Sequence, residues 1–276
     1  MNDVQLPADD ETRNVPMGAQ VVSVLNLDGL RKSDFVIDEV PVALVYNGIS
    51  HTVMMVTPQH LEDFALGFSL AEGIVQDISD VYDIEVQPGC GRGVEVHVTV
   101  SSESFWKLKE HRRTMAGRTG CGICGTESLE GVMRPLKALP FTQRFDLKHY
   151  GAGLAGIAQT EELRSLTGGT HAAVWLRPDG MVAFGREDVG RHVALDKLLG
   201  CRARTKEFDG ALFVSSRASY EMVQKAAACG VEILFAVSAP TALAVEVARR
   251  CNLTLVAFCR EKRANIYTHS QRLIGL

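Results

Sequence analysis

The chain has 276 residues, of which 46% are hydrophobic and 22% are charged, a composition typical of a globular protein and not of a disordered one. Its 29 basic and 33 acidic side chains leave a formal net charge of −4. This balance argues against a protein that coats nucleic acid or binds an anionic membrane, since both need a positive surface. The acidic, polar start and the interrupted apolar stretches predict neither a signal peptide nor a transmembrane helix, and seven cysteines, an odd number, then predict reduced thiols in the cytoplasm.

The chain divides at a glycine-rich segment near its middle. Residues 1–18 are polar and acidic and contain two prolines, which predicts a flexible tail. An α+β subdomain is expected at residues 19–115 and a mobile Gly/Cys loop at residues 116–126. A linker and a larger α/β subdomain are expected at residues 127–276.

The Asn47-Gly48 pair predicts a β-hairpin in the first subdomain. It separates two apolar runs at residues 42–46 and 49–56, and both turn residues tolerate a positive φ. Thr57-Pro58 then predicts the start of a helix, with the Thr57 hydroxyl as its N-cap. Alternating and striped apolar patterns further predict strands at residues 81–86 and 94–100 and a helix at residues 102–115.

The last third of the chain has the clearest pattern. Residues 126–170 give mixed signals and are interpreted as a linker with one amphipathic helix near residues 154–166. Apolar, β-branched runs then alternate with helices, which is typical of a parallel sheet covered by helices. The expected strands lie at residues 172–176 and 181–184 (as a hairpin), 211–215, 231–237 and 253–258, and the expected helices at residues 189–199, 218–229 and 241–250.

Cys121-Gly-Ile-Cys124 is the most reactive motif in the sequence. It lies among four glycines, and in the preceding stretch five basic residues and a histidine outnumber a single acid. Nearby positive charge lowers the pKa of a thiol and raises the fraction of reactive thiolate. The setting therefore suits a nucleophilic cysteine that reaches other molecules. The charged neighbours are Lys107, Lys109, Glu110, His111, Arg112, Arg113 and Arg118.

Several interpretations of this cysteine pair remain open. A structural zinc site needs four ligands, and the sequence has no second CxxC. A dithiol oxidoreductase would place the pair at a helix start after the first strand of a βαβ unit, which differs from the predicted order here. A sulfur-carrying cysteine and a plain turn are the other two. His60-Leu-Glu62 with Cys121 and Cys124 also resembles a zinc deaminase arrangement, although HxE triplets arise by chance.

Three segments that follow predicted strands are rich in small polar or basic residues, namely residues 215–219, 238–241 and 259–263. The carboxyl ends of parallel strands share one sheet edge, where helix N-termini offer free N–H groups and partial positive charge. These segments therefore predict a binding site for phosphate groups. The alternative for their serine and threonine residues is that the hydroxyls only cap helices. No Walker A or GxGxxG motif supports an ATPase or a Rossmann protein.

Two further segments carry candidate site residues. Gly185 to His192 places charged groups at a predicted helix start, where Arg191 or His192 can face a phosphate or act in catalysis. The alternative is that Asp188 is the N-cap while Arg191 and His192 are exposed or paired. His171 ends a Thr-Gly-Gly-Thr-His segment that could be only a turn. The other cysteines are expected to be packing or incidental thiols: Cys90, Cys201, Cys229, Cys251 and Cys259.

These segments together resemble the FdhD family, the formate dehydrogenase accessory sulfurtransferases, from about Val40 to the C-terminus. The resemblance is carried by Gly120-Cys-Gly-Ile-Cys-Gly125, Thr167-Gly-Gly-Thr-His171, Glu187-Asp-Val-Gly-Arg-His-Val-Ala-Leu-Asp-Lys197, Ser215-Ser-Arg-Ala-Ser-Tyr-Glu-Met-Val-Gln-Lys225 and the turn at residues 238–241.

The resemblance implies a cytoplasmic sulfurtransferase that accepts persulfide sulfur from a cysteine desulfurase. It passes the sulfur to the molybdenum or tungsten of a bis(molybdopterin guanine dinucleotide) cofactor, which is then inserted into formate dehydrogenase. The resemblance assigns the persulfide to Cys121 and makes Cys124 important. It also implies a cytidine deaminase-like α/β fold, in which a sheet carries helices on both faces beside the smaller N-terminal α+β part, a homodimer, and no zinc function.

The family's cofactor-contacting segment corresponds to Phe258-Cys-Arg-Glu-Lys-Arg263, where the acid Glu261 leaves open which residues touch the nucleotide. A guanine nucleotide such as GDP is the expected mimic of the cofactor. The alternatives are a non-catalytic chaperone that only binds the cofactor and a zinc-dependent nucleobase hydrolase. The predicted cofactor-binding residues are His171, Arg191, His192, Ser216, Arg217, Ser219, Ser238, Thr241, Phe258, Cys259, Arg260, Glu261, Lys262 and Arg263.

Overall fold

A computed structural model describes residues 15–116 and 136–276, and for residues 111–116 it describes the backbone alone. Residues 1–14 of the predicted tail (residues 1–18) and residues 117–126 of the predicted Gly/Cys loop lie outside the described residues, and so do Cys121 and Cys124.

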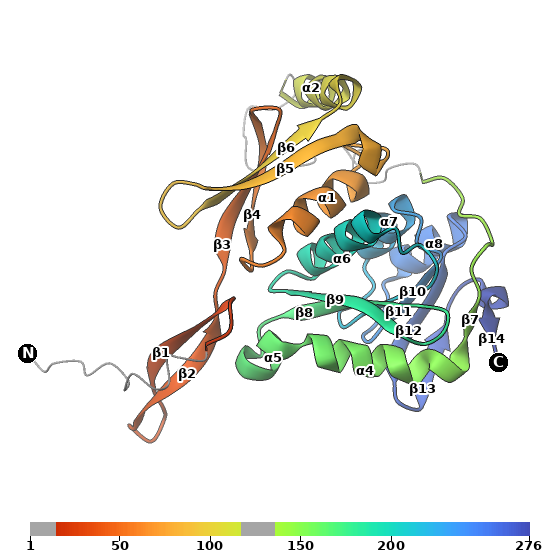
Figure 1. Ribbon diagram of the computed structural model, residues 1–276. Helices are drawn as coiled ribbons and strands as arrows, with labels where there is room; N and C mark the ends of the chain where they lie inside the picture. Colours follow the sequence, from red (N-terminus) through yellow and green to blue (C-terminus); the bar gives the residue numbers. More distant parts are fainter. Residues whose placement is uncertain (1–14, 117–135) are drawn as a thin grey trace, which may run out of the picture.

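A two-stranded hairpin, β1 (Ala19–Leu25) and β2 (Arg31–Ile37), precedes the predicted elements. Asn26 shapes its turn, because the Asn26 side-chain oxygen accepts the N–H of Leu30 at 2.8 Å and Gly29 takes a positive φ of 78°. Figure 1 shows the hairpin extending away from the rest of the molecule.

The predicted β-hairpin at Asn47-Gly48 is confirmed. Both turn residues have positive φ, 45° and 81°, and they join two strands of a four-stranded sheet with the order β4-β3-β6-β5. One face of this sheet packs against Phe64 and Leu108, which belong to its two helices. The elements are β3 (Val40–Tyr46), β4 (Ile49–Val56), α1 (Leu61–Ala71), a 3-10 turn η2 (Ile78–Asp80), β5 (Val81–Pro88), β6 (Val94–Val100) and α2 (Ser102–Ala116).

The predicted N-cap of the first helix is wrong. Helix α1 begins at Leu61, and its N-cap is His60, whose backbone is left-handed with a φ of 53°. The Thr57 hydroxyl is not available for capping, because it accepts the backbone N–H of Val189 at 3.1 Å. A tertiary contact therefore takes the group that the local pattern assigned to the helix start.

Two helices replace the single helix predicted near residues 154–166. The helical backbone is interrupted at Glu161, which separates α4 (Tyr150–Thr160) from α5 (Glu162–Thr167). The carboxylate of Glu187 accepts the N–H groups of Leu163 at 2.9 Å and Arg164 at 2.7 Å, so it serves as the cap of the second helix. Before α4, β7 (Phe145–Asp146) pairs with β14 (Leu273–Ile274), and short 3-10 turns occur at η3 (Leu147–His149) and η4 (Ser270–Arg272).

The C-terminal strands form one six-stranded sheet in the order β13-β12-β11-β10-β8-β9. Only β10, β11 and β12 run parallel, while β8, β9 and β13 join antiparallel. The prediction of a parallel sheet is therefore correct for the three central strands, and the predicted hairpin at residues 172–176 and 181–184 is confirmed as β8 and β9. The antiparallel edge strand β13 was not predicted. The strands are β8 (His171–Leu176), β9 (Val182–Asp188), β10 (Ala211–Val214), β11 (Ile233–Ala236), β12 (Thr254–Arg260) and β13 (Arg263–Ile266).

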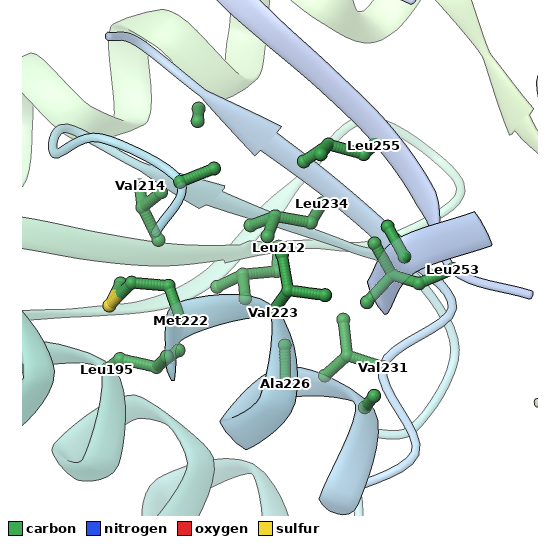
Figure 2. Packing of buried hydrophobic residues seen from close by; sticks show 14 of the residues in the cluster. Leu195, Leu212, Val214, Met222, Val223, Ala226, Val231, Leu234, Leu253 and Leu255 are labelled. Atoms are coloured by element: carbon green, nitrogen blue, oxygen red, sulfur yellow. The ribbon is translucent and has the colours of Figure 1, made fainter. Parts of the chain in front are cut away.

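Helices cover both faces of this sheet, as predicted. On one face Leu212 and Leu234 of the sheet pack against Met222 and Val223, as Figure 2 shows. This face carries α6 (Arg191–Thr205), α7 (Tyr220–Ala228) and α8 (Ala242–Arg250). Helix α6 begins two residues later and ends six residues later than predicted. Its N-cap is Gly190, and not Asp188 as the alternative interpretation of this segment had it.

The opposite face packs around Phe213 and Phe235, whose rings stack with centroids 4.4 Å apart, and around Phe145. Helix α4 lies over this face, so the sheet forms the middle of three layers (Figure 1). The α/β fold with helices on both sheet faces is thus confirmed, and the cytidine deaminase relation stays a prediction. Within residues 15–116 and 136–276, no helix combines the length and apolar character that a membrane span needs.

A close helix contact joins the two sheets. Helices α1 and α6 pack through Gly67 and Gly200, and a methyl group added at Gly67 would lie 1.8 Å from the carbonyl oxygen of Asp196. Buried charges accompany this contact: Asp63 lies 2.6 Å from Arg186. The layers in Figure 1 therefore follow the order four-stranded sheet, α1, the α6–α8 helices, six-stranded sheet and α4.

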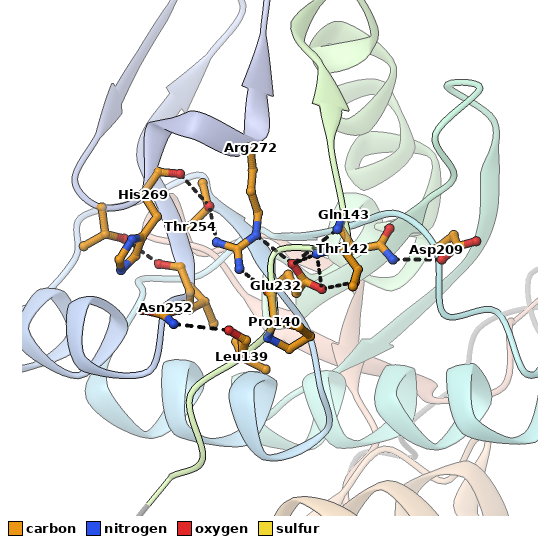
Figure 3. Close-up of polar contacts among 12 residues, drawn as sticks. Leu139, Pro140, Thr142, Gln143, Asp209, Glu232, Asn252, Thr254, His269 and Arg272 are labelled. Atoms are coloured by element: carbon orange, nitrogen blue, oxygen red, sulfur yellow. Dashed lines mark hydrogen bonds and ion pairs between the residues drawn. The ribbon is translucent and has the colours of Figure 1, made fainter.

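A buried ion pair fixes the segment that leads into β7. Arg272 and Glu232 are almost fully buried and lie 2.7 Å apart, and Glu232 also accepts the N–H of Thr142 (Figure 3). Arg272 donates to the Pro140 carbonyl and stacks on Phe141, with its guanidinium carbon 3.9 Å from the ring centroid. The chain that follows the cysteine segment is thereby fixed at the amino-terminal edge of the six-stranded sheet.

Candidate functional site

The N-termini of three helices meet at one edge of the six-stranded sheet. The ends of β10 and β11 share this edge because the strands are parallel. The end of β9 joins them, since Asp188 pairs with His171 at the start of the antiparallel strand β8. Helices α6, α7 and α8 therefore begin side by side, and their first-turn N–H groups and partial positive charges concentrate at this carboxyl edge.

Backbone hydrogen bonds connect the two predicted serine-rich segments. The N–H of Ser238 donates to Ser216 at 3.3 Å, and the N–H of Thr241 donates to Ala218 at 3.0 Å. Phe258 donates its N–H to the Ser238 carbonyl at 3.1 Å, which brings the third segment next to them. The fold thus places all three predicted segments together, including the predicted residues Ser216, Arg217, Ser219, Ser238 and Thr241.

The side chains of these segments differ in what they do. Thr241 caps α8, because its hydroxyl accepts the N–H of Ala244 at 3.2 Å, so the capping alternative describes Thr241. Ser216 is buried and donates to the carbonyl of Arg217 at 3.0 Å. Ser219 occupies the N-cap position of α7 but makes no capping hydrogen bond. Within the described part of the chain, the exposed Arg217 and the unpaired Ser219 hydroxyl can contact a ligand.

His171, Arg191 and His192 lie at the same edge, around the start of α6. Burial, followed by the positive charges of Arg164 and Arg191, lowers the pKa of His171 below its usual value of 6.5. Burial also lowers the pKa of His192, although Glu221 opposes this shift from 2.9 Å away. His192 is therefore held by the first turn of α7, whereas His171 and Arg191 line the edge itself, where Arg191 supplies positive charge and His171 favours its neutral form.

Among the described residues, His171 Nδ1, Arg191 Nε and Ser219 Oγ are buried at this edge and have no hydrogen-bond partner. Unpaired buried polar atoms are rare in folded proteins, and each calls for an explanation. Here they occur beside three helix N-termini that favour anions. The arrangement suits an anionic ligand that accepts and donates hydrogen bonds.

The segment Phe258–Arg263 has another local structure than expected. It contains the end of β12, a tight turn and the start of β13, so no helix begins after this strand. Phe258 takes a left-handed φ of 54°, and the pairing register with β13 shifts between Ala257 and Arg260. Helix N-termini therefore contribute N–H groups at the starts of α6, α7 and α8, whereas this third segment contributes none from a helix.

The side chains from Arg260 to Arg263 are exposed, Phe258 is half-buried and Cys259 is buried. The side chain of Cys259 lies in the core below α4, and burial raises the pKa of its thiol to about 11. The thiol is therefore not accessible to a cofactor, which argues against the prediction that this side chain contacts one. Arg260 donates to the Val237 carbonyl beside the carboxyl edge. Glu261, Lys262 and Arg263 line the rim of a cavity of about 260 Å³ whose walls are mainly apolar.

Pairs of buried charges behind the edge were not predicted. Asp188 and Lys197 are fully buried, 2.7 Å apart, and Asp196 lies 2.9 Å from Lys225. The sequence contains one signal for them, because Asp196 and Lys197 interrupt an otherwise apolar helix face, but their partners are distant in sequence. Within residues 15–116 and 136–276, no group of three or more His, Cys, Asp or Glu side chains could hold a metal ion.

A family model described as the FdhD/NarQ family matches residues 37–274. The chain belongs to this family. The structure is also similar to the crystal structure of a candidate formate dehydrogenase accessory protein from Desulfotalea psychrophila, with a TM-score of 0.71 and 23% sequence identity over 93% of this chain and 98% of that chain. This likeness shows a shared fold. The family membership confirms the resemblance inferred from the sequence motifs.

Proposed function

We propose that this FdhD/NarQ family member is a cytoplasmic sulfurtransferase that matures formate dehydrogenase, as a homodimer. It would accept persulfide sulfur from a cysteine desulfurase and transfer it to the molybdenum or tungsten of bis(molybdopterin guanine dinucleotide), which is the substrate of the reaction. The likeness to a candidate formate dehydrogenase accessory protein supports this assignment. The observation that carries it is the carboxyl edge, where three helix N-termini and unpaired polar atoms suit the phosphate groups of a dinucleotide.

Sulfur transfer in this proposal uses Cys121 and Cys124. The Cys121 thiolate attacks the terminal sulfur of the donor's persulfide, a new S–S bond forms, and the donor cysteine leaves as a thiolate. The Cys124 thiolate then attacks Cys121, and the terminal sulfur leaves as hydrosulfide toward the metal. The resulting Cys121–Cys124 disulfide is returned to two thiols by a cellular dithiol reductant.

The cofactor-binding residues of the proposal are those at the carboxyl edge. Arg191, Arg217 and Arg260 supply positive charge there, and the N–H groups of the three helix starts supply hydrogen bonds. Ser219 and His171 offer the unpaired atoms that a phosphate or a base edge can satisfy. Lys262 and Arg263 extend the positive surface beyond the edge along the β12–β13 turn.

The test is the intact mass of the protein after incubation with a cysteine desulfurase and cysteine. Wild-type protein is expected to gain one sulfur, and Cys121→Ala is expected to gain none while it still binds GDP. Cys90→Ala is the matched control, because Cys90 is an exposed thiol outside the carboxyl edge. Sulfur uptake by Cys121→Ala would refute the assignment, and maturation of formate dehydrogenase without either loop thiol would favour a non-catalytic chaperone.

A further inference from the structure

Two connecting turns that are far apart in sequence meet behind the carboxyl edge. One joins β4 to α1 and contains Thr57, and the other joins β9 to α6 and contains Val189 and Gly190. The first turn belongs to the part of the chain that forms the four-stranded sheet, whereas the second leads directly into the helix start that carries Arg191. Their contact therefore connects that sheet to the proposed binding site.

Thr57 uses all of its polar groups in this contact. Its N–H donates to Asp188 Oδ2 at 3.0 Å, and its hydroxyl accepts the N–H of Val189 at 3.1 Å. Its carbonyl accepts a hydrogen bond from Lys197 Nζ at 2.9 Å. Thr57 is fully buried, so none of these bonds can be replaced by bulk water.

The buried pair of Asp188 and Lys197 completes the arrangement. Lys197 lies 2.7 Å from Asp188 Oδ2, and the second oxygen, Oδ1, accepts the N–H of Gly190 at 2.8 Å. The two N–H groups that precede α6 are therefore both bound on the inner side, at Thr57 and Asp188. The first free N–H groups of the helix are those from Arg191 onward, which face the carboxyl edge.

We propose that Thr57, together with the Asp188–Lys197 pair, is a positioning residue that holds the first turn of α6 in the orientation needed for ligand binding at the carboxyl edge. The inference rests on the proposed function, since it assigns the ligand to that site. It gives the N-terminal part of the chain a part in binding although Thr57 itself does not reach the edge. The hydroxyl is the group to test, because it alone can be removed with little change in shape.

The experiment compares GDP affinity in the full-length variants Thr57→Val and Thr57→Ser. Valine keeps the shape of threonine but leaves the Val189 N–H without an acceptor, and we expect GDP binding to weaken about tenfold, the fold-change equivalent to about 1.4 kcal/mol. Serine keeps the hydroxyl and should bind within about twofold of wild type. Hydrogen–deuterium exchange over residues 189–195 should be faster in Thr57→Val alone.

Thr254→Val is the matched control. Thr254 is equally buried, and its hydroxyl donates to the His269 carbonyl at 2.8 Å, but it lies at the start of β12, at the opposite edge of the sheet. It should lower stability without changing GDP affinity or exchange at residues 189–195. Wild-type affinity and exchange in Thr57→Val, or equal effects in Thr254→Val, would overturn the inference. If wild-type protein binds no GDP, the proposed nucleotide site fails, and the exchange comparison still tests the role of Thr57.

Discussion

At the residue scale, the buried charged side chains behind the carboxyl edge are the most demanding feature of the protein. Asp196 has no exposed surface, and Lys225 lies 2.9 Å from each of its carboxylate oxygens. Glu72 shares the same ammonium group at 2.8 Å. Burial of a carboxylate is costly even when it is paired, and burial raises the pKa of Asp196 to about 6, although Lys225 opposes the shift.

The raised pKa predicts how stability depends on pH. Below the pKa of 3.8 in the unfolded chain, Asp196 is protonated in both the folded and the unfolded protein, so no buried charge lowers the stability. As the pH rises above 3.8, the unfolded chain loses this proton first, and the free energy of unfolding falls until the folded protein also loses it near pH 6. We expect the stability of wild type relative to Asp196→Asn to fall by about 3 kcal/mol in total between about pH 3 and pH 7, and to stay level above that. Urea unfolding of both proteins at several pH values checks this. A constant difference across the range would contradict the assigned pKa.

At the scale of single elements, the starts of α7 and α8 look alike in sequence and differ in structure. Ser219 and Thr241 both occupy N-cap positions with extended backbones. Only Thr241 accepts a hydrogen bond from its helix, from the N–H of Ala244. The start of α7 therefore keeps its first N–H groups for the proposed ligand, while at α8 the Thr241 hydroxyl already accepts one of them.

This difference predicts unequal effects of the same substitution. Thr241→Ala should lower the free energy of unfolding by about 1 kcal/mol, the usual cost of losing an N-cap. Ser219→Ala should change it by less than about 0.5 kcal/mol, since no capping bond is lost. Denaturant titrations of the two variants give the comparison directly. Equal losses in both variants would mean that Ser219 caps α7 in solution.

At the scale of the whole molecule, the α1–α6 contact determines how the two sheets are held together. Close approach requires glycine on both helices, because a methyl group on Gly200 would lie 1.9 Å from the carbonyl oxygen of Asp63. Backbone atoms at such distances cannot move aside independently, so any added side chain separates the helices. The same interface buries Asp63, which pairs with Arg186 and Arg204.

Gly67→Ala should therefore destabilise the protein by about 3 kcal/mol or more, since overpacking against backbone has no easy relief. Gly151→Ala is the matched control: Gly151 is also helical, and nothing lies within 4 Å of an added methyl group. Alanine there should leave stability unchanged or raise it by up to about 1 kcal/mol. Thermal unfolding compares the two, and similar melting temperatures would disprove the close contact.

Local features of the sequence were enough to predict a large part of the fold. The Asn47-Gly48 turn and the strands beside it follow from local backbone preferences and are confirmed. A sheet covered by helices follows from the alternation of apolar runs with helices, and the resemblance to the family implied helices on both of its faces. The family, too, can be inferred from contiguous motifs such as residues 187–197, because motif residues lie within one short stretch of chain.

Other features depended on contacts between distant residues. The local sequence predicts that Thr57 caps a helix, but its hydroxyl accepts a hydrogen bond from the N–H of Val189, more than a hundred positions away. The local pattern around Asp188 suits an N-cap, but in the structure Asp188 is buried and binds Lys197 and Thr57. The single helix predicted near residue 160 is two helices, because Glu187 caps the second one. The local pattern of residues determines which helices and strands form, because these depend on neighbours in the sequence. The tertiary structure determines the hydrogen-bond partner of each buried polar group, because burial removes water and leaves groups from distant parts of the chain as the available partners.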